Sequence, residues 1–121
     1  MSKDILIIED EAIIALDIAR MVKNNGFDVA GVASEAGRAL VIAETKRPSL
    51  ALVDIKLKGD IDGIEVAKIL KERFSIPVVF ITAYSDESVR ARAMQVEPAG
   101  YLIKPINRLE FGKALKTLLP G

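Results

Sequence analysis

The chain has 121 residues, of which half are hydrophobic and 28% are charged, and its 17 basic and 17 acidic side chains cancel at neutral pH. This composition predicts one soluble globular domain over residues 1–121, and the balanced charge argues against direct binding to nucleic acid or to an anionic membrane. The chain contains neither cysteine nor histidine. Disulfides, thiol catalysis, Ser-His-Asp chemistry and the usual zinc sites are therefore excluded.

The start of the chain does not have the shape of a signal peptide. The apolar run ILII is too short for the hydrophobic region of a signal peptide, and the acidic run EDE follows it at once. No apolar stretch approaches the length of a membrane-spanning helix. We therefore expect a cytoplasmic protein.

Short apolar runs alternate with amphipathic stretches along the whole chain. The runs are aliphatic or β-branched, which is typical of strands buried on both faces. We expect strands, in chain order, over residues 4–9 (DILIIE), 27–33 (FDVAGVA), 50–54 (LALVD), 77–82 (PVVFIT) and 100–104 (GYLIK).

Helical periodicity follows each of these runs. The apolar helix faces are Ile14, Ile18, Met21 and Val22; Ala36, Leu40 and Ala43; Val66, Ile69, Leu70 and Phe74; and Phe111, Leu115, Leu118 and Leu119. Residues 86–96 form the weakest pattern, because few apolar residues share a face there beside Arg90 and Arg92. We interpret Asp62 as the residue that caps the third helix.

Five successive β-α units predict a doubly wound α/β domain, with a parallel sheet and helices on both faces. Ligands of such sheets bind beyond the carboxyl ends of the strands. The residues at those ends are Glu9 and Asp10 after the first strand, Asp54 after the third, Thr82 after the fourth and Lys104 after the fifth. We expect these side chains to converge at one edge.

The chemistry of this set points to phosphoryl transfer. Crowded carboxylates repel one another unless a proton or a cation neutralises them, and oxygen ligands favour a hard ion such as Mg²⁺ or Mn²⁺. An aspartate can act as the nucleophile and form an aspartyl-phosphate, which makes Asp54 the candidate. Thr82 and Lys104 are then suited to contact the phosphoryl oxygens.

Each of these residues also has an ordinary structural interpretation. Asp10 taken alone reads as the N-cap of the first helix, and Glu9 and Glu11 as favourable charges at the same helix end. Thr82 alone is a polar strand end, and Lys104 with the following proline is an ordinary turn. The joint placement of the set at neighbouring strand ends favours a functional site.

Asp54 raises a further alternative, because Lys56 follows two residues later and is a possible counter-ion for a purely structural acid. The expected placement of the strands makes a metal ion and Lys104 the better cationic partners of Asp54.

Four motifs, IIEDE, LVDI, FITA and GYLIKP, follow one another in this order over nearly the whole chain. Together they resemble the receiver domain of two-component response regulators, the CheY-like family. The resemblance implies a flavodoxin-like (βα)5 fold with a five-stranded parallel sheet of order 2-1-3-4-5. It also implies that Asp54 accepts a phosphoryl group from a phosphohistidine on a sensor histidine kinase or histidine phosphotransfer protein. The domain itself would then catalyse phosphorylation and dephosphorylation as a regulatory phosphoacceptor rather than as an enzyme.

By the same resemblance, Asp10, Asp54 and the backbone carbonyl of Lys56 hold the metal, and Glu9 acts nearby or through water. Thr82 and Lys104 match the phosphate-contacting pair, and Tyr101 matches an aromatic switch residue that follows Thr82. The resemblance further implies a cis peptide bond before Pro105.

Some features depart from the commonest pattern of the family. The loop IKLKGDIDG after Asp54 is one residue longer than usual, and Lys56 and Tyr84 occupy two variable positions that tune the lifetime of the phosphorylated state. A Lys56 side chain over the site screens attacking water and repels the metal. We therefore expect slow loss of phosphate and modest Mg²⁺ affinity.

Two other functions compete with this interpretation. A phosphatase of the haloacid-dehalogenase type needs a second aspartate two residues after its nucleophile, where this chain has Lys56. A receiver-like module that binds partners regardless of phosphate remains possible from the sequence. Output in the family runs through the fourth helix, fifth strand and fifth helix, where a homodimer or another partner is expected. The sequence leaves open whether the chain is a stand-alone regulator or one domain of a longer protein.

Overall fold

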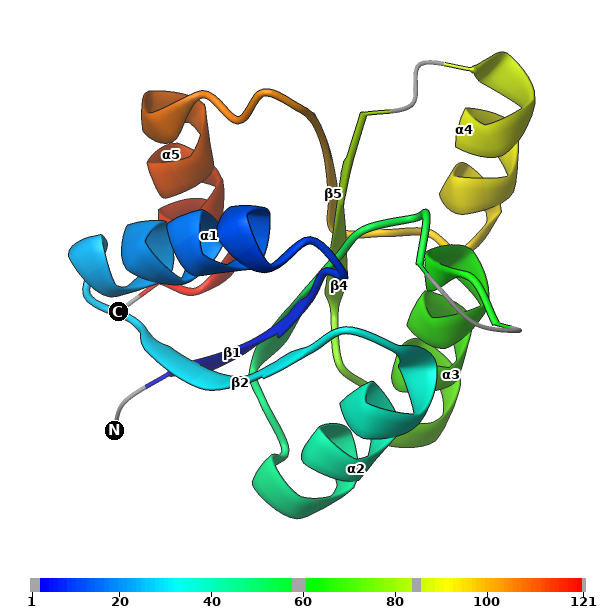
Figure 1. The fold of residues 1–121 in the computed structure, drawn as a ribbon, viewed down its shortest axis with the longest axis horizontal. Helices are drawn as coiled ribbons and strands as arrows, with labels where there is room; N and C mark the ends of the chain where they lie inside the picture. The colour runs from blue at the N-terminus through cyan, green and yellow to red at the C-terminus, as the bar shows by residue number, and fades with distance from the viewer. Residues whose placement is uncertain (1–2, 58–60, 84–85, 121) are drawn as a thin grey trace.

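The computed structural model describes residues 3–57, 61–83 and 86–120, and five strands alternate with five helices along them (Figure 1). The strands are β1 (Asp4–Ile8), β2 (Asp28–Ala33), β3 (Leu50–Val53), β4 (Val78–Thr82) and β5 (Gly100–Ile103). The helices are α1 (Ala12–Asn24), α2 (Ala36–Lys46), α3 (Gly63–Phe74), α4 (Glu87–Gln95) and α5 (Arg108–Leu118).

All described strand pairs are parallel, and their order in the sheet is β2-β1-β3-β4-β5. The sequence-based prediction of a doubly wound, flavodoxin-like sheet of order 2-1-3-4-5 is confirmed. The central strands β3 and β4 are buried along their whole length, which explains why they read as continuous apolar runs rather than as alternating ones.

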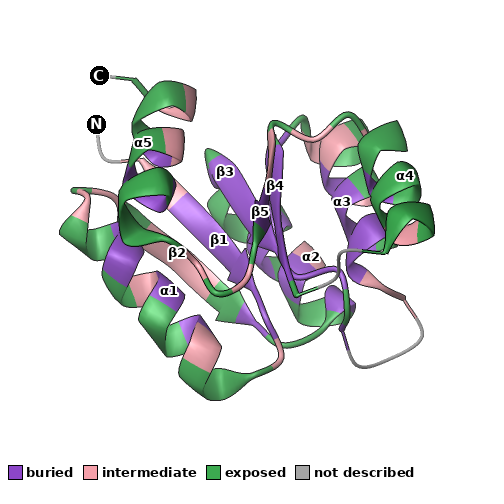
Figure 2. Cartoon of the chain, turned by 90° about the horizontal axis from the view of Figure 1, so that it is seen from above, coloured by how far each residue is buried: buried purple, intermediate pink, exposed green. Residues whose placement is uncertain are grey.

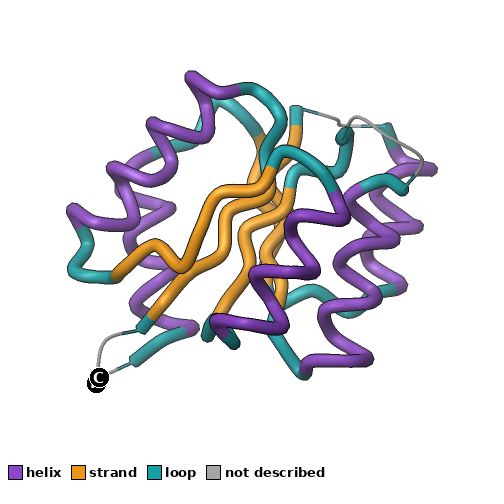
Figure 3. Tube along the Cα trace, turned by 60° about the horizontal axis from the view of Figure 1, so that its bottom comes forward, coloured by secondary structure: helices purple, strands orange, loops and turns teal. Residues whose placement is uncertain are grey.

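The sheet lies between two layers of helices (Figure 3). One face packs mainly against α1 and α5, through a cluster that includes Ile18, Phe111 and Leu115. The other face packs mainly against α2 and α3, through a cluster that includes Ala43, Leu70 and Phe80. These two apolar layers hold the strands in register, so the residues just beyond the strand ends have fixed backbone positions.

The helix ends follow the chemistry of their sequences in several places. Asp62 caps α3 by accepting a hydrogen bond from the backbone N–H of Glu65 at 3.0 Å, as predicted. The interpretation of Asp10 as an N-cap is wrong: the N-cap of α1 is Glu11, and no side chain accepts a capping hydrogen bond there. Asp10 is thus left available for another role at the edge of the sheet.

Candidate functional site

Residues from three strand ends meet at the carboxyl edge of the sheet. Glu9 follows β1, Asp54 follows β3 and Lys104 follows β5. The Lys104 ammonium donates to Glu9 Oε1 at 2.7 Å and to Asp54 Oδ2 at 3.1 Å. The side chains of Lys104, Glu9 and Asp54 are only 14%, 1% and 8% exposed. We call Glu9, Asp10, Asp54, Thr82 and Lys104 the rim.

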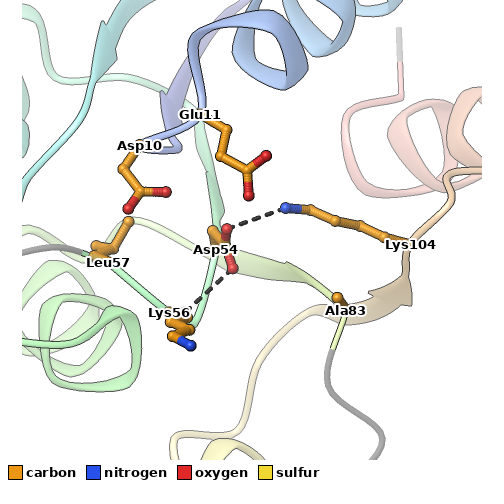
Figure 4. Close-up of a pocket in the computed structure, with 7 residues that line it drawn as sticks. All are labelled: Asp10, Glu11, Asp54, Lys56, Leu57, Ala83 and Lys104. Carbon is orange, nitrogen blue, oxygen red and sulfur yellow. Dashed lines mark hydrogen bonds and ion pairs between the residues drawn. The ribbon is translucent and has the colours of Figure 1, made fainter.

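Lys104, and not Lys56, is the lysine whose ammonium pairs with Asp54. Lys56 contributes its backbone N–H, which donates to Asp54 Oδ1 at 3.2 Å, while the residue as a whole is exposed. Figure 4 shows the Lys104 side chain reaching across from β5 toward the Asp54 carboxylate. Asp54 is therefore held by two donors that come from different parts of the chain.

The rim contains three carboxylates that are arranged to share a cation. Oxygens of Glu9, Asp10 and Asp54 all lie within 4.8 Å of one another. Asp10 and Asp54 border an open cavity of about 350 Å³, which Lys56, Ala83 and Lys104 also line. The donor set is made of oxygen only, and carboxylates with open coordination positions suit a hard divalent ion such as Mg²⁺ or Mn²⁺. The residues present therefore fit the metal that the sequence predicts.

The crowding of the carboxylates has an electrostatic consequence. The pKa of Glu9 is raised from an ordinary value of 4.5 to about 7, first by burial and then by a hydrogen bond with the Asp54 carboxylate, against the opposing effect of Lys104. Although burial alone lowers the pKa of the Lys104 ammonium, its bonds with Glu9 and Asp54 outweigh this effect and leave that pKa raised. The rim thus carries one firmly charged cation beside a carboxyl group that titrates near neutral pH.

Thr82 is the last residue of β4 and is completely buried. Its backbone carbonyl accepts a hydrogen bond from the Lys104 N–H at 2.8 Å, so the two residues lie on adjacent strands at the same edge. The next residue, Ala83, lines the cavity. The structure therefore places Thr82 next to Lys104 at the edge of the sheet where the sequence predicts it. Tyr84, the second position expected to tune the phosphorylated lifetime, lies outside the described residues.

Tyr101 lies on β5 directly opposite Phe80 of β4. The two rings meet edge to face, with centroids 6.3 Å apart and an interplanar angle of 63°. The Arg90 guanidinium of α4 lies 4.9 Å from the Tyr101 ring centroid. Tyr101 is half-buried, and its ring contacts both Phe80 of the sheet and Arg90 of α4. The bond between Lys104 and Pro105 is cis, as the resemblance predicted.

Gly63 is a supporting residue that the sequence analysis did not assign to the site. Its N–H donates to the Ile55 carbonyl at 2.8 Å, and a Cβ added to it would lie 2.0 Å from the backbone oxygen of Asp54. Only glycine therefore allows the start of α3 to approach the Asp54 backbone so closely. The available signal was the glycine directly after a capping aspartate, Asp62-Gly63.

The order of the strands and the residues of the rim are those that the sequence analysis expects of a receiver domain. Comparison with known families leads to the same class of protein. The profile of the response regulator receiver domain matches residues 5–116. The chain therefore belongs to the receiver domain family of two-component response regulators, which are signalling proteins.

Two curated relatives illustrate the similarity. The phyllosphere-induced regulator PhyR of Methylorubrum extorquens is 42% identical over 106 residues, which are 87% of this chain and 39% of PhyR. The transcriptional regulatory protein PdtaR of Mycobacterium tuberculosis is 34% identical over 103 residues, which are 85% of this chain and 50% of PdtaR. The chain thus spans half or less of the length of these relatives.

Solved structures show the same fold. The signal receiver domain of a modulated diguanylate cyclase from Desulfovibrio desulfuricans has a TM-score of 0.92 and 34% identity, and the match covers 98% of this chain and 94% of that one. The receiver domain of PhyR from Erythrobacter litoralis has a TM-score of 0.84 and 30% identity over 98% of this chain and 90% of that one. Among the residues that the structure describes, no helix has the length and apolar character needed to span a membrane.

Proposed function

We propose that this domain is a phosphorylation-activated switch in which Asp54 accepts a phosphoryl group from a phosphohistidine. The donor is a sensor histidine kinase or a histidine phosphotransfer protein, since the chain has no histidine of its own. The observation that carries the proposal is the position of Asp54: a buried carboxylate that opens onto the cavity, with the Lys104 ammonium 3.1 Å away. The cytoplasm is the compartment that this role requires.

In the proposed transfer, a carboxylate oxygen of Asp54 attacks phosphorus. The new O–P bond forms as the P–N bond to the donor imidazole breaks. The imidazole keeps the electron pair of that bond and leaves as a neutral ring, because its other nitrogen carries a proton. Lys104 balances the charge that accumulates on one phosphoryl oxygen, and the Thr82 hydroxyl donates to another. The resulting acyl phosphate is lost when water attacks phosphorus and returns the carboxylate of Asp54.

Glu9, Asp10, Asp54 and the backbone carbonyl of Lys56 are the proposed residues for holding Mg²⁺ or Mn²⁺. The bound ion would neutralise the carboxylates and the phosphoryl oxygens during transfer. Replacing Asp10 with asparagine removes one of the three clustered carboxylates and should weaken binding of Mg²⁺, measured by calorimetry without any phosphodonor.

The proposed phosphoacceptor can be tested by mass. Incubation with a small phosphoramidate and Mg²⁺ should add one phosphoryl group to the chain, as measured by intact-mass spectrometry. Asp54→Asn should abolish the addition, whereas Asp28→Asn, a change at an exposed aspartate at the start of β2, should leave it intact. An adduct that survives Asp54→Asn, or no adduct at all, would contradict the proposal and favour a module that binds partners regardless of phosphate.

Lys56 and Tyr84 are the proposed tuning residues, and the same measurement tests Lys56. We propose that the Lys56 side chain slows the attack of water, so Lys56→Asn should lose its phosphoryl group severalfold faster than the unmodified sequence. A Lys56→Asn protein with an unchanged or longer phosphorylated lifetime would contradict this role.

The proposed output face is formed by α4, β5 and α5. It carries the exposed apolar side chains Met94, Ile103 and Leu109, the last of them 69% exposed. Tyr101 lies on β5. As the proposed switch residue, it turns inward when Thr82 is drawn to the phosphoryl group. If a homodimer forms through this face, the domain should sediment as a larger species after phosphorylation than before it.

A further inference from the structure

Helix α4 has the weakest apolar attachment of the described helices. Ala93 is its one buried residue among those the structure describes, whereas α3 buries five, including Ile64, Val66 and Leu70. In Figure 2 α4 is exposed over most of its length. The partly buried Val89 and Val96 and the stacking of Arg90 on Tyr101 add to this small apolar contact. Polar contacts therefore make up a larger share of what holds α4 than they do for α3.

At its carboxyl end, α4 is held by a lysine from another helix. The Lys71 ammonium of α3 donates to the carbonyls of Val96 at 2.7 Å and Glu97 at 2.9 Å. The last carbonyls of a helix have no partners within it, and a cation suits the negative end of the helix dipole. Glu97 has a φ of 58°, a left-handed conformation that is uncommon for a residue other than glycine. Lys71 thus completes a helix end whose backbone is unusual.

A second contact joins α4 to the start of α3. The Arg92 guanidinium lies 3.1 Å from Asp62 Oδ2, while Asp62 Oδ1 accepts the capping hydrogen bond from Glu65. The next residue in the chain, Gly63, packs directly on the backbone of Asp54. The side chain that contacts α4 is therefore one residue away from the backbone that supports the phosphoacceptor.

We propose that Lys71 and the Asp62–Arg92 pair form a polar latch that holds α4 against α3 in the unphosphorylated domain. Water can replace both contacts when α4 shifts, so the helix can move without exposing a large apolar core. Because Asp62 directly precedes Gly63, which packs on the Asp54 backbone, the latch gives a route from the rim to α4 that does not pass through Thr82 and Tyr101. Its link to phosphorylation rests on the proposed function, but the latch itself does not.

The latch is tested by hydrogen exchange on the unphosphorylated domain. Lys71→Met should make the amides in the last turn of α4 exchange about tenfold faster, because two hydrogen bonds from a charged donor are lost, while the amides of α5 stay unchanged. Lys68→Met is the matched control, since Lys68 is an exposed lysine one turn earlier on α3 and should leave α4 unaffected. Lys71→Arg keeps a charged donor and should retain most of the protection.

The outcomes separate the latch from general stability. Unchanged α4 amides in Lys71→Met would overturn the proposal, and so would equal acceleration in α4, α3 and α5, which would mark Lys71 as a general stabilising residue. Asp62→Asn provides a second variant, because asparagine still caps a helix but lacks the charge that pairs with Arg92. It should accelerate exchange in the middle of α4 about twofold, and no change there would remove Asp62 from the latch.

The link between the latch and phosphorylation is tested separately, by the rate of phosphate uptake. If a released α4 favours the activated conformation, Lys71→Met should take up phosphate from a small phosphoramidate severalfold faster than the Lys68→Met control. An equal rate in a protein with faster α4 exchange would overturn the regulatory part and leave the latch standing. If the unmodified domain takes up no phosphate, the proposed function fails, whereas the exchange measurement still decides the latch.

Discussion

Charged side chains hold both the rim and helix α4 in place, but they are buried at the rim and more exposed at α4. At the rim, Lys104 contacts Glu9 and Asp54 where all three side chains are nearly excluded from water. At α4, the Arg92 and Asp62 side chains are 53% and 34% exposed. An exposed ion pair contributes about 0 to 1 kcal/mol and is screened by salt, whereas breaking a buried one leaves a charge without compensation. The contacts at the rim therefore hold it in place more firmly than those of α4 hold the helix.

Backbone packing adds to this difference. The rim rests on strands buried on both faces and on the close approach of Gly63 to Asp54, whereas α4 contributes little to either apolar cluster. The proposed function needs both properties, because phosphoryl transfer requires a fixed geometry and the signal requires a surface that moves.

The largest expected effect comes from a substitution that disrupts the backbone beneath the rim. Gly63→Ala should lower the free energy of unfolding by about 3 kcal/mol, because the added Cβ would meet the Asp54 backbone oxygen at 2.0 Å and force α3 away from the rim. Urea denaturation measures the change. The domain should also lose phosphate uptake, since the backbone that carries Asp54 must shift.

Gly37→Ala is the matched control for this substitution. Gly37 is exposed in α2, and the nearest atom to an added Cβ is a Glu35 side-chain oxygen at 3.6 Å, an ordinary contact. Replacing it with alanine should raise the free energy of unfolding by about 0.5 to 1 kcal/mol, because alanine favours the helix. If the two substitutions change the free energy of unfolding equally, Gly63 does not pack tightly on the Asp54 backbone. The rim would then be less rigid than we infer.

Much of the rim could be predicted because it depends on strand ends. Once residues 50–54 are recognised as a buried parallel strand, the position of Asp54 follows, and the same reasoning places Glu9, Thr82 and Lys104. The thin apolar face of residues 86–96 was also visible in the sequence, and α4 indeed buries little. These features depend on periodicity and on strand topology, both of which a sequence contains.

The latch and the role of Gly63 could not be predicted in the same way. Lys71 lies 25 and 26 positions from the residues it contacts and reads as an ordinary surface lysine of an amphipathic helix. Its partners are backbone carbonyls, which have no signature in the sequence. The N-cap interpretation of Asp10 failed for a related reason: α1 begins one residue later than a capping Asp10 requires, and its N-cap is Glu11. Such details depend on how neighbouring elements pack.

A smaller effect is expected when the pH is changed so that only the rim titrates. In the native state Glu9 holds its proton up to about pH 7, whereas in the unfolded chain it releases the proton near its ordinary pKa of 4.5. Between these values the native state binds more protons than the unfolded state, so the free energy of unfolding falls as the pH rises. The raised pKa of Lys104 and the lowered pKa of Asp86 act outside this window, since their ordinary values are 10.5 and 3.8.

Raising the pH from about 5 to about 7 in metal-free buffer should therefore reduce the free energy of unfolding by about 2 kcal/mol. Urea denaturation at each pH measures the slope. Glu9→Gln is the control, because glutamine mimics the protonated carboxyl without titrating and should flatten the dependence. Saturating Mg²⁺ should also reduce it, since a cation at the rim favours the ionised carboxylate. A free energy of unfolding that rises with pH over this window would show that Glu9 is ionised in the native rim, and that Lys104 alone compensates the clustered carboxylates.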